Sequence, residues 1–510
     1  MAKALMIQGT GSGAGKSLLV AALCRIFRNK GINVAPFKAQ NMALNSAIAV
    51  EGGEIGRAQV LQARACGLDP SVDMNPVLLK TAGERGSQVI LRGKVHATML
   101  ARDYYAFRNE AWKTVTASYK QLSGKHDLII MEGAGSPAEI NLADVDIVNM
   151  AMAKHAKAPV LLVGDIDKGG VFASLFGTVK LLGRDSGRIR AFIINKFRGD
   201  PAILAPGLDM IREKTGKPVI GVLPYLRDIG LPEEDGLALA QKPAGGRRQA
   251  EGEVVRIVIV RLRSISNFTD FDPFELEPDV RLQYSDRPED IENADLVIVP
   301  GSKNTVADLL WLKELRLDKS IKQAQARGTQ IIGICGGYQM LGKRIEDEHG
   351  IESEHRTIEG IGLLNIETHF GKEKMTCRAE AQLNADYGMR IAEWNCTEKL
   401  NGYEIHMGTS TGDIGLFRIR RIYPDSAFQI PNSEFVPDGS LNGNCWGSYL
   451  HGIFDNDLFR RGIINAVRVR KGLATLTPGV GYSAAVEEAL DRLADAFRRH
   501  VDMRFIEGLL

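Results

Sequence analysis

Short apolar runs recur along the first half of the chain, and each ends in a polar or glycine-rich stretch. Runs of this length with such boundaries are typical of strands buried in a parallel sheet. Helix-like sequence follows each run, which is the alternation of a doubly wound α/β domain. The predicted strands are residues 4–8, 34–37, 127–131, 160–163, 191–194 and 219–223.

A second series of apolar runs begins after a polar, glycine-rich stretch and predicts a second α/β domain. Its strands are expected at residues 255–260, 296–300 and 331–334. From Val486 onward, apolar residues recur at helical spacing, which indicates an amphipathic helix that packs on its apolar face. The predicted division is 1–235, a linker at 236–253, a second domain at 254–455, and a C-terminal helical extension at 456–510.

The run at 331–334 ends at Cys335, between Gly333 on one side and Gly336 and Gly337 on the other. A helical pattern follows, so the sulfur is expected at a sharp strand–turn–helix junction. Such a turn strains the backbone and needs small neighbours. It exposes the sulfur at the end of a sheet and directs helical N–H groups towards it, which favours the thiolate.

A cysteine nucleophile needs a base and an oxyanion hole. His451 is the preferred base and His406 the alternative, because each closes a strand-like run. The Gly336 N–H and the loop at Gly301 and Ser302 are expected to provide the oxyanion hole. A cysteine and an oxyanion hole on an α/β sheet fit thioester chemistry on an amide, although composition does not name the amide.

The first predicted strand runs into a phosphate-binding loop. Backbone N–H groups and the following helix would hold phosphates, Lys16 would reach the terminal phosphates, and Ser17 would bind Mg²⁺. Five residues separate Gly9 from Gly15 instead of the usual four, so this is a variant loop. The expected nucleotide-binding residues are Gly11, Ser12, Gly13, Ala14, Gly15, Lys16 and Ser17.

Polar side chains follow several other predicted strands of the first domain. Glu132 closes the strand at 127–131 and is expected to hold Mg²⁺ with Ser17, directly or through water. Lys38 and Asn41 follow the second strand, at the edge where parallel sheets bind ligands. Asp165 lies in a similar position.

Composition excludes several classes of function. A formal charge of +2 gives no electrostatic case for nucleic acid or an anionic membrane, and no apolar run is long enough to span a bilayer. The six cysteines form no CxxC pair, which argues against a zinc site or a disulfide framework. The same scattered cysteines favour a reducing cytoplasm. The first residues predict a strand and a glycine loop, so no signal peptide is expected.

The sequence around Cys335, Gly-Ile-Cys-Gly-Gly-Tyr-Gln, resembles class I glutamine amidotransferases. The Lys16 loop together with Glu132-Gly133-Ala134-Gly135 resembles the ATP-dependent domain of dethiobiotin synthetases. Together the two resemble the cobyrinate amidotransferase family. Further motifs make the resemblance to one member of this family more specific, and they are spread over nearly the whole chain. They are residues 37–42, 74–76, 139–142, 195–199 and 449–452.

The resemblance implies an amide ligase of cobalamin biosynthesis. One domain would release ammonia from L-glutamine through Cys335 and His451. The other would use ATP and Mg²⁺ to phosphorylate corrin carboxylates, which ammonia converts to amides. The substrate implied is adenosylcobyrinic acid a,c-diamide, amidated at carboxylates b, d, e and g. By motif position Asn195 would lie near the adenine, with Lys38, Asp146 and Asp165 near the carboxylate or metal.

One position departs from the class I pattern. Many members carry an acid two residues after the catalytic histidine, where this chain has Ile453. Without an acid to orient the imidazole, a slower or substrate-gated glutaminase is expected. Glu404 is the candidate for that missing carboxylate.

Three alternatives remain open at this stage. A partition-type switch ATPase uses a similar loop with an extra lysine five residues before Lys16, where this chain has Gly11. The sister enzyme that amidates carboxylates a and c shares both domains. A glutaminase domain kept only for docking is the third. The oligomeric state is also open, with a homo-oligomer as one option.

Overall fold

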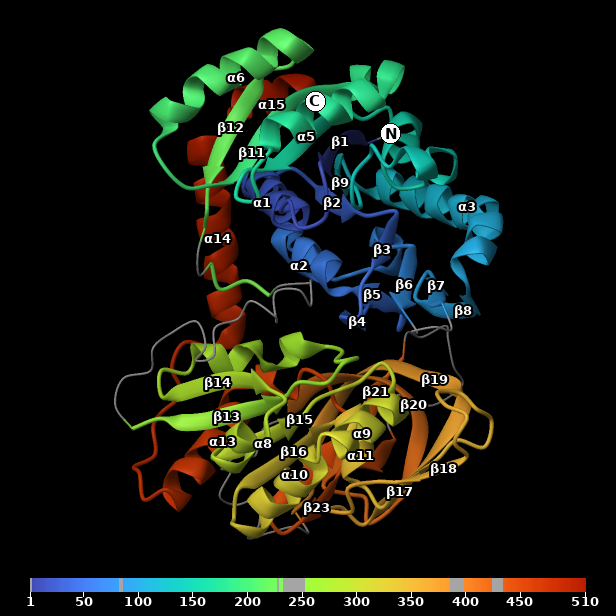
Figure 1. The fold of residues 1–510 in the computed structure, drawn as a ribbon, viewed down its shortest axis with the longest axis vertical. Coiled ribbons are helices and arrows are strands. Elements are labelled where there is room, and N and C mark those ends of the chain that lie inside the picture. The colour runs from blue at the N-terminus through green and yellow to red at the C-terminus, as the bar shows by residue number, and fades with distance from the viewer. Residues whose placement is uncertain (1, 82–85, 227–228, 233–252, 386–398, 424–433) are drawn as a thin grey trace. The chain divides into compact units, whose positions relative to one another are not determined.

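The structure is a computed structural model. It describes residues 2–81, 86–226, 229–232, 253–385, 399–423 and 434–510. These residues form two compact units (Figure 1). The first, the nucleotide-binding unit, comprises 1–43, 53–235 and 485–510, and the second, the glutaminase unit, comprises 44–52 and 236–484. Nearly all of the predicted linker, 236–253, lies outside the described residues. No helix in the described ranges is long and apolar enough to cross a membrane.

The predicted doubly wound α/β fold is confirmed for the nucleotide-binding unit. Its central sheet has the strand order β12-β11-β10-β1-β9-β2, with every pair of neighbours parallel. Strand order reverses beside β1, which places the ligand edge at the carboxyl ends of β1, β9 and β10. The strands are β1 (Lys3–Gly9), β2 (Val34–Phe37), β9 (Leu128–Glu132), β10 (Val160–Asp165), β11 (Ile189–Phe197) and β12 (Val219–Pro224).

Helices connect these strands and cover the sheet. The crossover through α1 runs in the opposite direction along the sheet from those through α5 and α6. Because such crossovers are right-handed, α1 covers one face and the other two helices cover the opposite face (Figure 1). The helices are α1 (Lys16–Asn29), α4 (Met150–His155), α5 (Val171–Leu181) and α6 (Pro201–Thr215).

A smaller sheet is inserted between β2 and α3 and was not predicted. It has the order β3-β6-β7-β8, with short strands of mixed exposure that give no clear period. Two helices accompany it, and α2 packs against α1. The elements are β3 (Gln40–Met42), β5 (Glu54–Gly56), α2 (Arg57–Cys66), η1 (Val72–Met74), β6 (Val77–Thr81), β7 (Ser87–Leu91), β8 (Lys94–Met99) and α3 (Ala101–Lys125).

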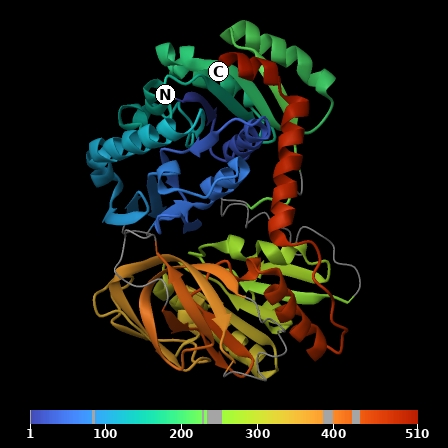
Figure 2. The same ribbon diagram turned by 180° about the vertical axis from the view of Figure 1, so that it is seen from behind.

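The end of the chain completes the nucleotide-binding unit. Helix α14 (Tyr482–His500) is the predicted amphipathic helix, and its Glu487 and Asp491 both bind the buried Arg25 of α1, at 2.8 and 2.7 Å. Val501 forms a bridge with Gly221 of β12, and α15 (Met503–Leu509) follows (Figure 2). The predicted extension at 456–510 is therefore divided between the two units, because α13 (Asp457–Arg470) belongs to the glutaminase unit.

The glutaminase unit contains a second mostly parallel sheet, as predicted. Its order is β14-β13-β15-β16-β24-β23, and only β23 runs antiparallel to its neighbour. The strands are β13 (Val255–Val260), β14 (Val280–Ser285), β15 (Leu296–Val299), β16 (Gln330–Ile334), β23 (Ser440–Asn442) and β24 (Cys445–Ser448). The helices are α8 (Pro288–Glu292), α9 (Thr305–Glu314), α10 (Leu317–Ala326) and α11 (Gly336–Leu341).

An additional sheet of the glutaminase unit was not predicted. It has the order β18-β17-β19-β21-β22, and the long strand β20 pairs with β19. Segment 44–52, with the short strand β4 (Ser46–Ile48), also belongs to this unit. The strands are β17 (Arg344–Glu346), β18 (Thr357–Glu359), β19 (Ile366–Leu383), β20 (Leu400–Gly412), β21 (Phe417–Ile422) and β22 (Phe435–Asp438).

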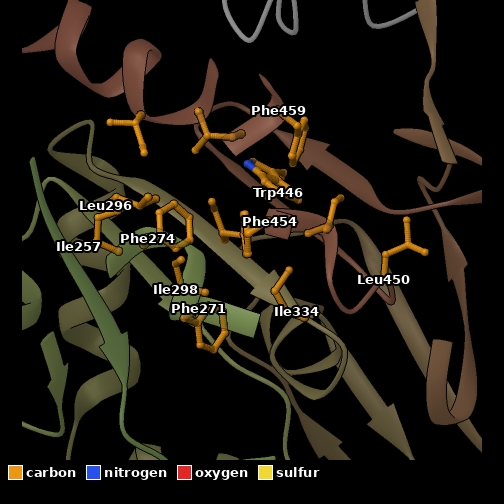
Figure 3. Close-up of a cluster of buried hydrophobic side chains, with 14 of the residues drawn as sticks. Ile257, Phe271, Phe274, Leu296, Ile298, Ile334, Trp446, Leu450, Phe454 and Phe459 are labelled. Carbon is orange, nitrogen blue, oxygen red and sulfur yellow. The ribbon is translucent and has the colours of Figure 1, made fainter. Parts of the chain in front are cut away.

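One core of the glutaminase unit combines aliphatic side chains with a group of aromatic ones (Figure 3). Phe271 and Phe274 come from η5 (Phe268–Leu276), and both rings contact Phe454, with centroid distances of 6.2 and 4.8 Å. All three side chains are fully buried. Aromatic pairs add to the stability that burial supplies, so this cluster holds η5 against the turn that contains Phe454.

A buried cluster of charges joins α13 to the chain after η5. Arg460 and Arg461 donate to Glu277 at 2.8 and 2.9 Å, while Arg461 and Arg468 donate to Asp279 at 2.8 and 3.0 Å. Burial acts to raise the pKa of Asp279, but the hydrogen bonds and charges of Arg461 and Arg468 outweigh it and lower that pKa. The carboxylate therefore stays ionised inside the unit.

We expect Asp279→Asn to destabilise the glutaminase unit by about 3 kcal/mol at pH 7, because the buried Arg468 loses the Asp279 carboxylate and the buried Arg461 loses one of its two carboxylates. The folded-state pKa of Asp279 is depressed, so its contribution is present above the unfolded aspartate pKa and is lost as pH falls through the folded value. The difference in melting temperature between variant and wild type, measured by calorimetry, should therefore shrink below about pH 4. A difference that stays constant with pH would contradict this.

Candidate active sites

The carboxyl ends of neighbouring strands bring the predicted glutaminase residues together. Cys335 directly follows β16, and His451 lies three residues after β24, the parallel neighbour of β16. The Cys335 N–H donates to the carbonyl of Ser448, which links the two strand ends at 2.9 Å. Gly301 follows β15, on the other side of β16. Because parallel strands end at one edge of a sheet, distant parts of the chain meet here.

Cys335 occupies the strained turn that the glycines predict. Its φ of 52° lies in a region that non-glycine residues rarely adopt, and the side chain is only 6% exposed. A Cβ at position 337 would lie 1.9 Å from the carbonyl oxygen of Val299, and one at 333 would lie 2.8 Å from the backbone of Tyr338. The glycines are therefore required by close approach of the backbone, and they let α11 begin immediately after the sulfur.

His451 is buried between the cysteine and a carboxylate. Its Nδ1 is 2.6 Å from Oδ2 of Asp270, and the side chains of His451 and Asp270 are 1% and 2% exposed. Burial acts to lower the pKa of His451, but the negative charges and hydrogen bonds of Asp270 and Cys335 raise the pKa to about 10. The imidazole is therefore held as the imidazolium at neutral pH, which is the form that stabilises a thiolate beside it.

Asp270 supplies the carboxylate that sequence reasoning missed. It lies 181 positions before His451, and spacing alone gives no signal for that pairing. The candidate Glu404 lies elsewhere: its carboxylate binds Arg421 at 2.6 Å and accepts from His406 at 3.2 Å. The expectations that His451 lacks a carboxylate and that Glu404 replaces it are corrected, because η5 brings Asp270 to the imidazole.

The alternative base, His406, has different partners. Its Nδ1 is 3.0 Å from the carbonyl of Gly408, and its ring stacks on Tyr449 with a centroid distance of 3.8 Å. The other ring nitrogen of His406, Nε2, is hydrogen-bonded to the Glu404 carboxylate. The pKa of Glu404 is about 2, because His406 and Arg421 overcome the effect of burial, which acts to raise it. These contacts give both residues a role in holding β20.

The two predicted oxyanion-hole donors lie next to each other. A Cβ at Gly336 would lie 2.9 Å from the Ser302 nitrogen. The bridge between Ile265 and Ser302 uses the N–H groups of Ser266 and Lys303, which leaves the Ser302 N–H outside that bridge. Asp308 binds the Ser302 hydroxyl at 2.6 Å and so fixes the loop.

We expect Asp270→Asn to lower glutaminase kcat by about 10²- to 10³-fold, because the imidazole loses its orientation and its counter-charge. The raised pKa of His451 should fall towards its ordinary value. The imidazolium is lost as pH rises through that pKa, so the alkaline limb of the kcat/KM profile should move to lower pH. Glutamate release measured from pH 6 to 10 tests this.

Glu404→Gln is the matched control for that prediction. It removes one buried carboxylate of the same unit that contacts a histidine but not His451. Its pH profile should keep the wild-type alkaline limb. A shift in Glu404→Gln as large as that in Asp270→Asn would contradict the assignment of Asp270.

The phosphate-binding loop of the other unit follows β1. Lys16 is buried, and its Nζ donates to the carbonyls of Gly11 and Gly135 at 2.9 and 3.1 Å. Gly15 has a φ of 94°, and a Cβ there would lie 2.3 Å from Nδ2 of Asn195. The loop therefore needs glycine for both its conformation and its close contact with β11.

Glu132 is the centre of a buried polar cluster. Its Oε1 accepts from Ser17 and from Lys38, both at 2.8 Å, and its Oε2 accepts from Gln62 at 2.6 Å. Burial acts to raise the pKa of Glu132, but Lys38, Gln62 and Ser17 together lower that pKa. A carboxylate thus stays ionised beside the phosphate-binding loop.

This cluster offers oxygen atoms that fit Mg²⁺. The Ser17 hydroxyl donates its proton to Glu132, which leaves the lone pairs of its oxygen available. The Oε1 atom of Gln62 is buried and has no hydrogen-bond partner in the part of the chain that the structure describes. Mg²⁺ prefers oxygen ligands and usually keeps one or two carboxylates together with phosphates and water. Gln62, on α2, was not predicted.

The other site residues predicted for this unit differ in their hydrogen-bond partners. Asn195 donates to the Ala14 carbonyl at 2.9 Å, and Asp165 binds Lys196 at 2.9 Å. Asn41 donates to Gln59 at 3.0 Å, close to the Glu132 cluster. Asp146 instead accepts from three backbone N–H groups at the start of α4, which gives it a capping role.

Lys196 was also missed by sequence reasoning. Its φ is 62°, and its Nζ donates to the carbonyl of Gly13 in the phosphate-binding loop at 2.7 Å. It directly follows Asn195 at the end of β11, so its position after a strand was the available signal. A second cation therefore lies beside the loop.

A cysteine–histidine–carboxylate site on one parallel sheet and a phosphate-binding loop on another define a glutamine amidotransferase with a nucleotide-binding domain. A family model of the CobQ/CobB/MinD/ParA nucleotide binding domain matches residues 5–239. A model of the CobB/CobQ-like glutamine amidotransferase domain matches residues 256–459.

Curated relatives match the whole chain. Cobyric acid synthase of Thermodesulfovibrio yellowstonii is 48% identical over 503 residues, covering 99% of this chain and 98% of its own. Cobyric acid synthase of Syntrophobacter fumaroxidans is 45% identical over 514 residues, covering 100% and 99%. The chain belongs to the cobyric acid synthase family. Among solved structures, a glutamine amidotransferase has a TM-score of only 0.29 at 15% identity, over 41% of this chain and 98% of that one.

Proposed function

We propose that this chain uses ATP and L-glutamine to amidate carboxylates b, d, e and g of adenosylcobyrinic acid a,c-diamide, forming adenosylcobyric acid. The observation that carries the proposal is full-length identity of 45–48% to cobyric acid synthases, together with both active sites in one chain. Residues 1–235 are assigned to carboxylate activation and residues 254–455 to glutamine hydrolysis.

In the glutaminase unit, Cys335 is assigned as the nucleophile. Its thiolate would attack the glutamine side-chain amide, and the imidazolium of His451 would give a proton to the departing ammonia. Asp270 orients the imidazole through Nδ1. The N–H groups of Gly336 and Ser302, which lie close together, would stabilise the tetrahedral oxyanion. Water then releases glutamate from the thioester.

In the nucleotide-binding unit, the residues of the phosphate-binding loop position ATP. Lys16 would exchange its bonds to loop carbonyls for bonds to phosphate oxygens. Ser17, Glu132 and Gln62 would hold Mg²⁺, which neutralises charge that develops on the transferred phosphoryl group. Asn195 is assigned to the adenine side of the site. Lys38, Asn41 and Asp165 are assigned to the corrinoid carboxylate.

The division of labour follows from chemistry. A carboxylate is a poor electrophile because hydroxide leaves poorly, so activation as an acyl phosphate is required. Free ammonia is mostly protonated at neutral pH and is then not nucleophilic. Producing it within the same chain raises its effective concentration and limits its protonation.

The test is ADP release by the purified protein with MgATP and glutamine, with and without adenosylcobyrinic acid a,c-diamide, combined with mass spectrometry of the corrinoid. Corrinoid-dependent ADP release with up to four exchanges of hydroxyl for amino groups supports the proposal. ATP and glutamine turnover that leaves the corrinoid unchanged would contradict the substrate.

The alternatives predict different results. A sister enzyme would amidate carboxylates a and c of the hexa-acid precursor instead of the a,c-diamide. A partition-type ATPase would hydrolyse ATP without consuming glutamine. The full-length relatives with a glutaminase domain do not favour either alternative.

A further inference from the structure

Segment 44–52 comes from the N-terminal part of the chain but belongs to the glutaminase unit. The chain on both sides of it, up to residue 43 and from residue 53, belongs to the nucleotide-binding unit. Lys38 and Asn41, which lie in the polar cluster around Glu132, precede the segment by only a few residues. A short stretch of backbone therefore leads directly from one unit's active site into the other unit.

The segment is fastened to η5 by a reciprocal pair of asparagine contacts. The Ser46 N–H donates to Oδ1 of Asn267 at 3.0 Å, and the Phe268 N–H donates to Oδ1 of Asn45 at 3.2 Å. Phe268 is the first residue of η5, so its N–H has no acceptor within that helix. Asn45 thus caps the helix that carries Asp270, from more than 200 positions away.

Tyr403 connects the segment to the triad of Cys335, His451 and Asp270. Its ring stacks on the His451 imidazole with a centroid distance of 5.3 Å, and the two backbones are hydrogen-bonded in both directions. Its hydroxyl lies 3.3 Å from Oδ1 of Asp270 and 3.4 Å from the Ser46 carbonyl. All of these groups are buried.

The Tyr403 hydroxyl has one proton for two acceptors. Both distances exceed the usual O–H···O separation of about 2.8 Å, as expected when one proton is shared. The Ser46 carbonyl therefore competes directly with Asp270 for that proton. A displacement of the segment at Ser46 therefore changes how much of the Tyr403 proton Asp270 receives, and with it the negative charge that Asp270 places beside His451.

We infer that segment 44–52 is a positioning element for the glutaminase triad, acting through Asn45 on η5 and through the Ser46 carbonyl on Tyr403 and Asp270. The inference deepens the proposed function and rests on it, because it requires glutamine hydrolysis and carboxylate activation within one chain.

The direction of the effect follows from the two contacts. With the segment in place, the Ser46 carbonyl shares the Tyr403 proton with Asp270, so Asp270 keeps more of its negative charge for the imidazolium. With the segment displaced, Tyr403 donates to Asp270 alone, which weakens the attraction between Asp270 and His451. The helix η5 also loses its cap, so Asp270 is held less firmly. Both changes lower glutaminase activity.

Such an element would link ammonia release to the state of the nucleotide-binding unit. Lys38 and Asn41 are joined to Ser46 by only a few backbone residues, along which a change in their surroundings would be transmitted. Glutamine hydrolysed without an activated carboxylate is wasted, so a glutaminase that responds to this segment serves the coupled reaction.

The first experiment measures Asn45→Ala. Its expected glutaminase kcat is about tenfold lower, because Asp270 is misplaced. The groups that face His451 are Asp270, Cys335 and Tyr403. With Tyr403 donating to Asp270, the alkaline limb of the kcat/KM profile should move to lower pH. Ammonia-dependent synthesis should be unchanged.

Asn444→Ala is the matched control, because the Asn444 side chain also bonds to backbone in this unit, donating to two carbonyls at 2.9 and 2.7 Å, but does not contact η5. It should retain the wild-type alkaline limb. Equal loss of glutaminase and ammonia-dependent synthesis in Asn45→Ala would overturn the inference, since it would show a general folding role. Unchanged glutaminase activity would overturn it as well.

The second experiment adds Tyr403→Phe, which keeps the ring on His451 and removes the shared proton. In that background Asn45→Ala should no longer shift the alkaline limb, although kcat still falls through the loss of the cap. A shift of the same size with and without the hydroxyl would overturn the role of Tyr403. Glutamate release needs no corrinoid, so these results stand apart from any failure of the proposed substrate.

Discussion

Cys335→Ser is expected to abolish glutamine-dependent amidation and to leave ammonia-dependent amidation intact. The serine hydroxyl is not ionised at neutral pH, and the imidazolium that stabilises a thiolate gives it no comparable help. Removing the nucleophile of a triad eliminates most of the catalysis that the triad provides, so glutaminase kcat should fall by about 10⁴-fold or more. Serine is close to cysteine in size, so the turn at φ 52° is expected to be retained.

The measurement compares two nitrogen sources for one variant. Corrinoid products are quantified with glutamine and with ammonium chloride at alkaline pH, where free ammonia is abundant. Retained synthesis with ammonia shows that the nucleotide-binding unit is folded and active. Equal loss with both nitrogen sources would contradict a separate glutaminase step, whereas retained glutamine use would contradict Cys335 as the nucleophile.

Lys16→Ala is expected to have the opposite effect to Cys335→Ser: it should abolish amidation but leave glutamine hydrolysis intact. Synthesis should fall by about 10³-fold or more with either nitrogen source, because the charge that meets the terminal phosphates is lost. Glutamate release in the absence of ATP should continue, since Cys335 and His451 lie on a different sheet. ADP formation and glutamate formation, measured in the same reaction, separate the two effects.

Lys113→Ala provides the matched control for the lysine. Lys113 is an exposed residue of α3 in the same unit, away from the phosphate-binding loop. It should retain wild-type ADP formation. If Lys16→Ala kept more than a tenth of the wild-type rate, its assignment to the phosphates would be wrong.

Contiguous signals in the sequence were sufficient for the two reactive loops. The glycines from Gly9 to Gly15 and the cation Lys16 lie directly between one strand and one helix. The hydrophobic pattern and the glycine spacing therefore predict this loop. The same holds for Cys335, whose flanking glycines reflect close backbone contacts. His451 was selected from nine histidines because it closes a strand-like run and is followed by glycine, and in the structure that strand is the parallel neighbour of β16.

The inserted sheet β3-β6-β7-β8 and the sheet around β19 were not predicted, because their strands lack such contiguous signals. Their strands are short or partly exposed, and many lie at edges where neither alternation nor a continuous apolar run develops. Helix α14 was predicted as amphipathic, but its partner was not, because its apolar stripe fits many surfaces. Its acidic residues find Arg25 only when the chain returns to α1.

The sequence by itself determined the class of fold, the phosphate-binding loop and the strained turn that carries Cys335, because each depends on residues within one strand–turn–helix. Only the tertiary structure decided the carboxylate of the triad and its surroundings. Asp270 reaches His451 through η5 and the aromatic contacts of Phe271, Phe274 and Phe454, and Asn45 reaches η5 from another part of the chain. Such contacts depend on which surfaces pack together, and no local period or spacing encodes that choice.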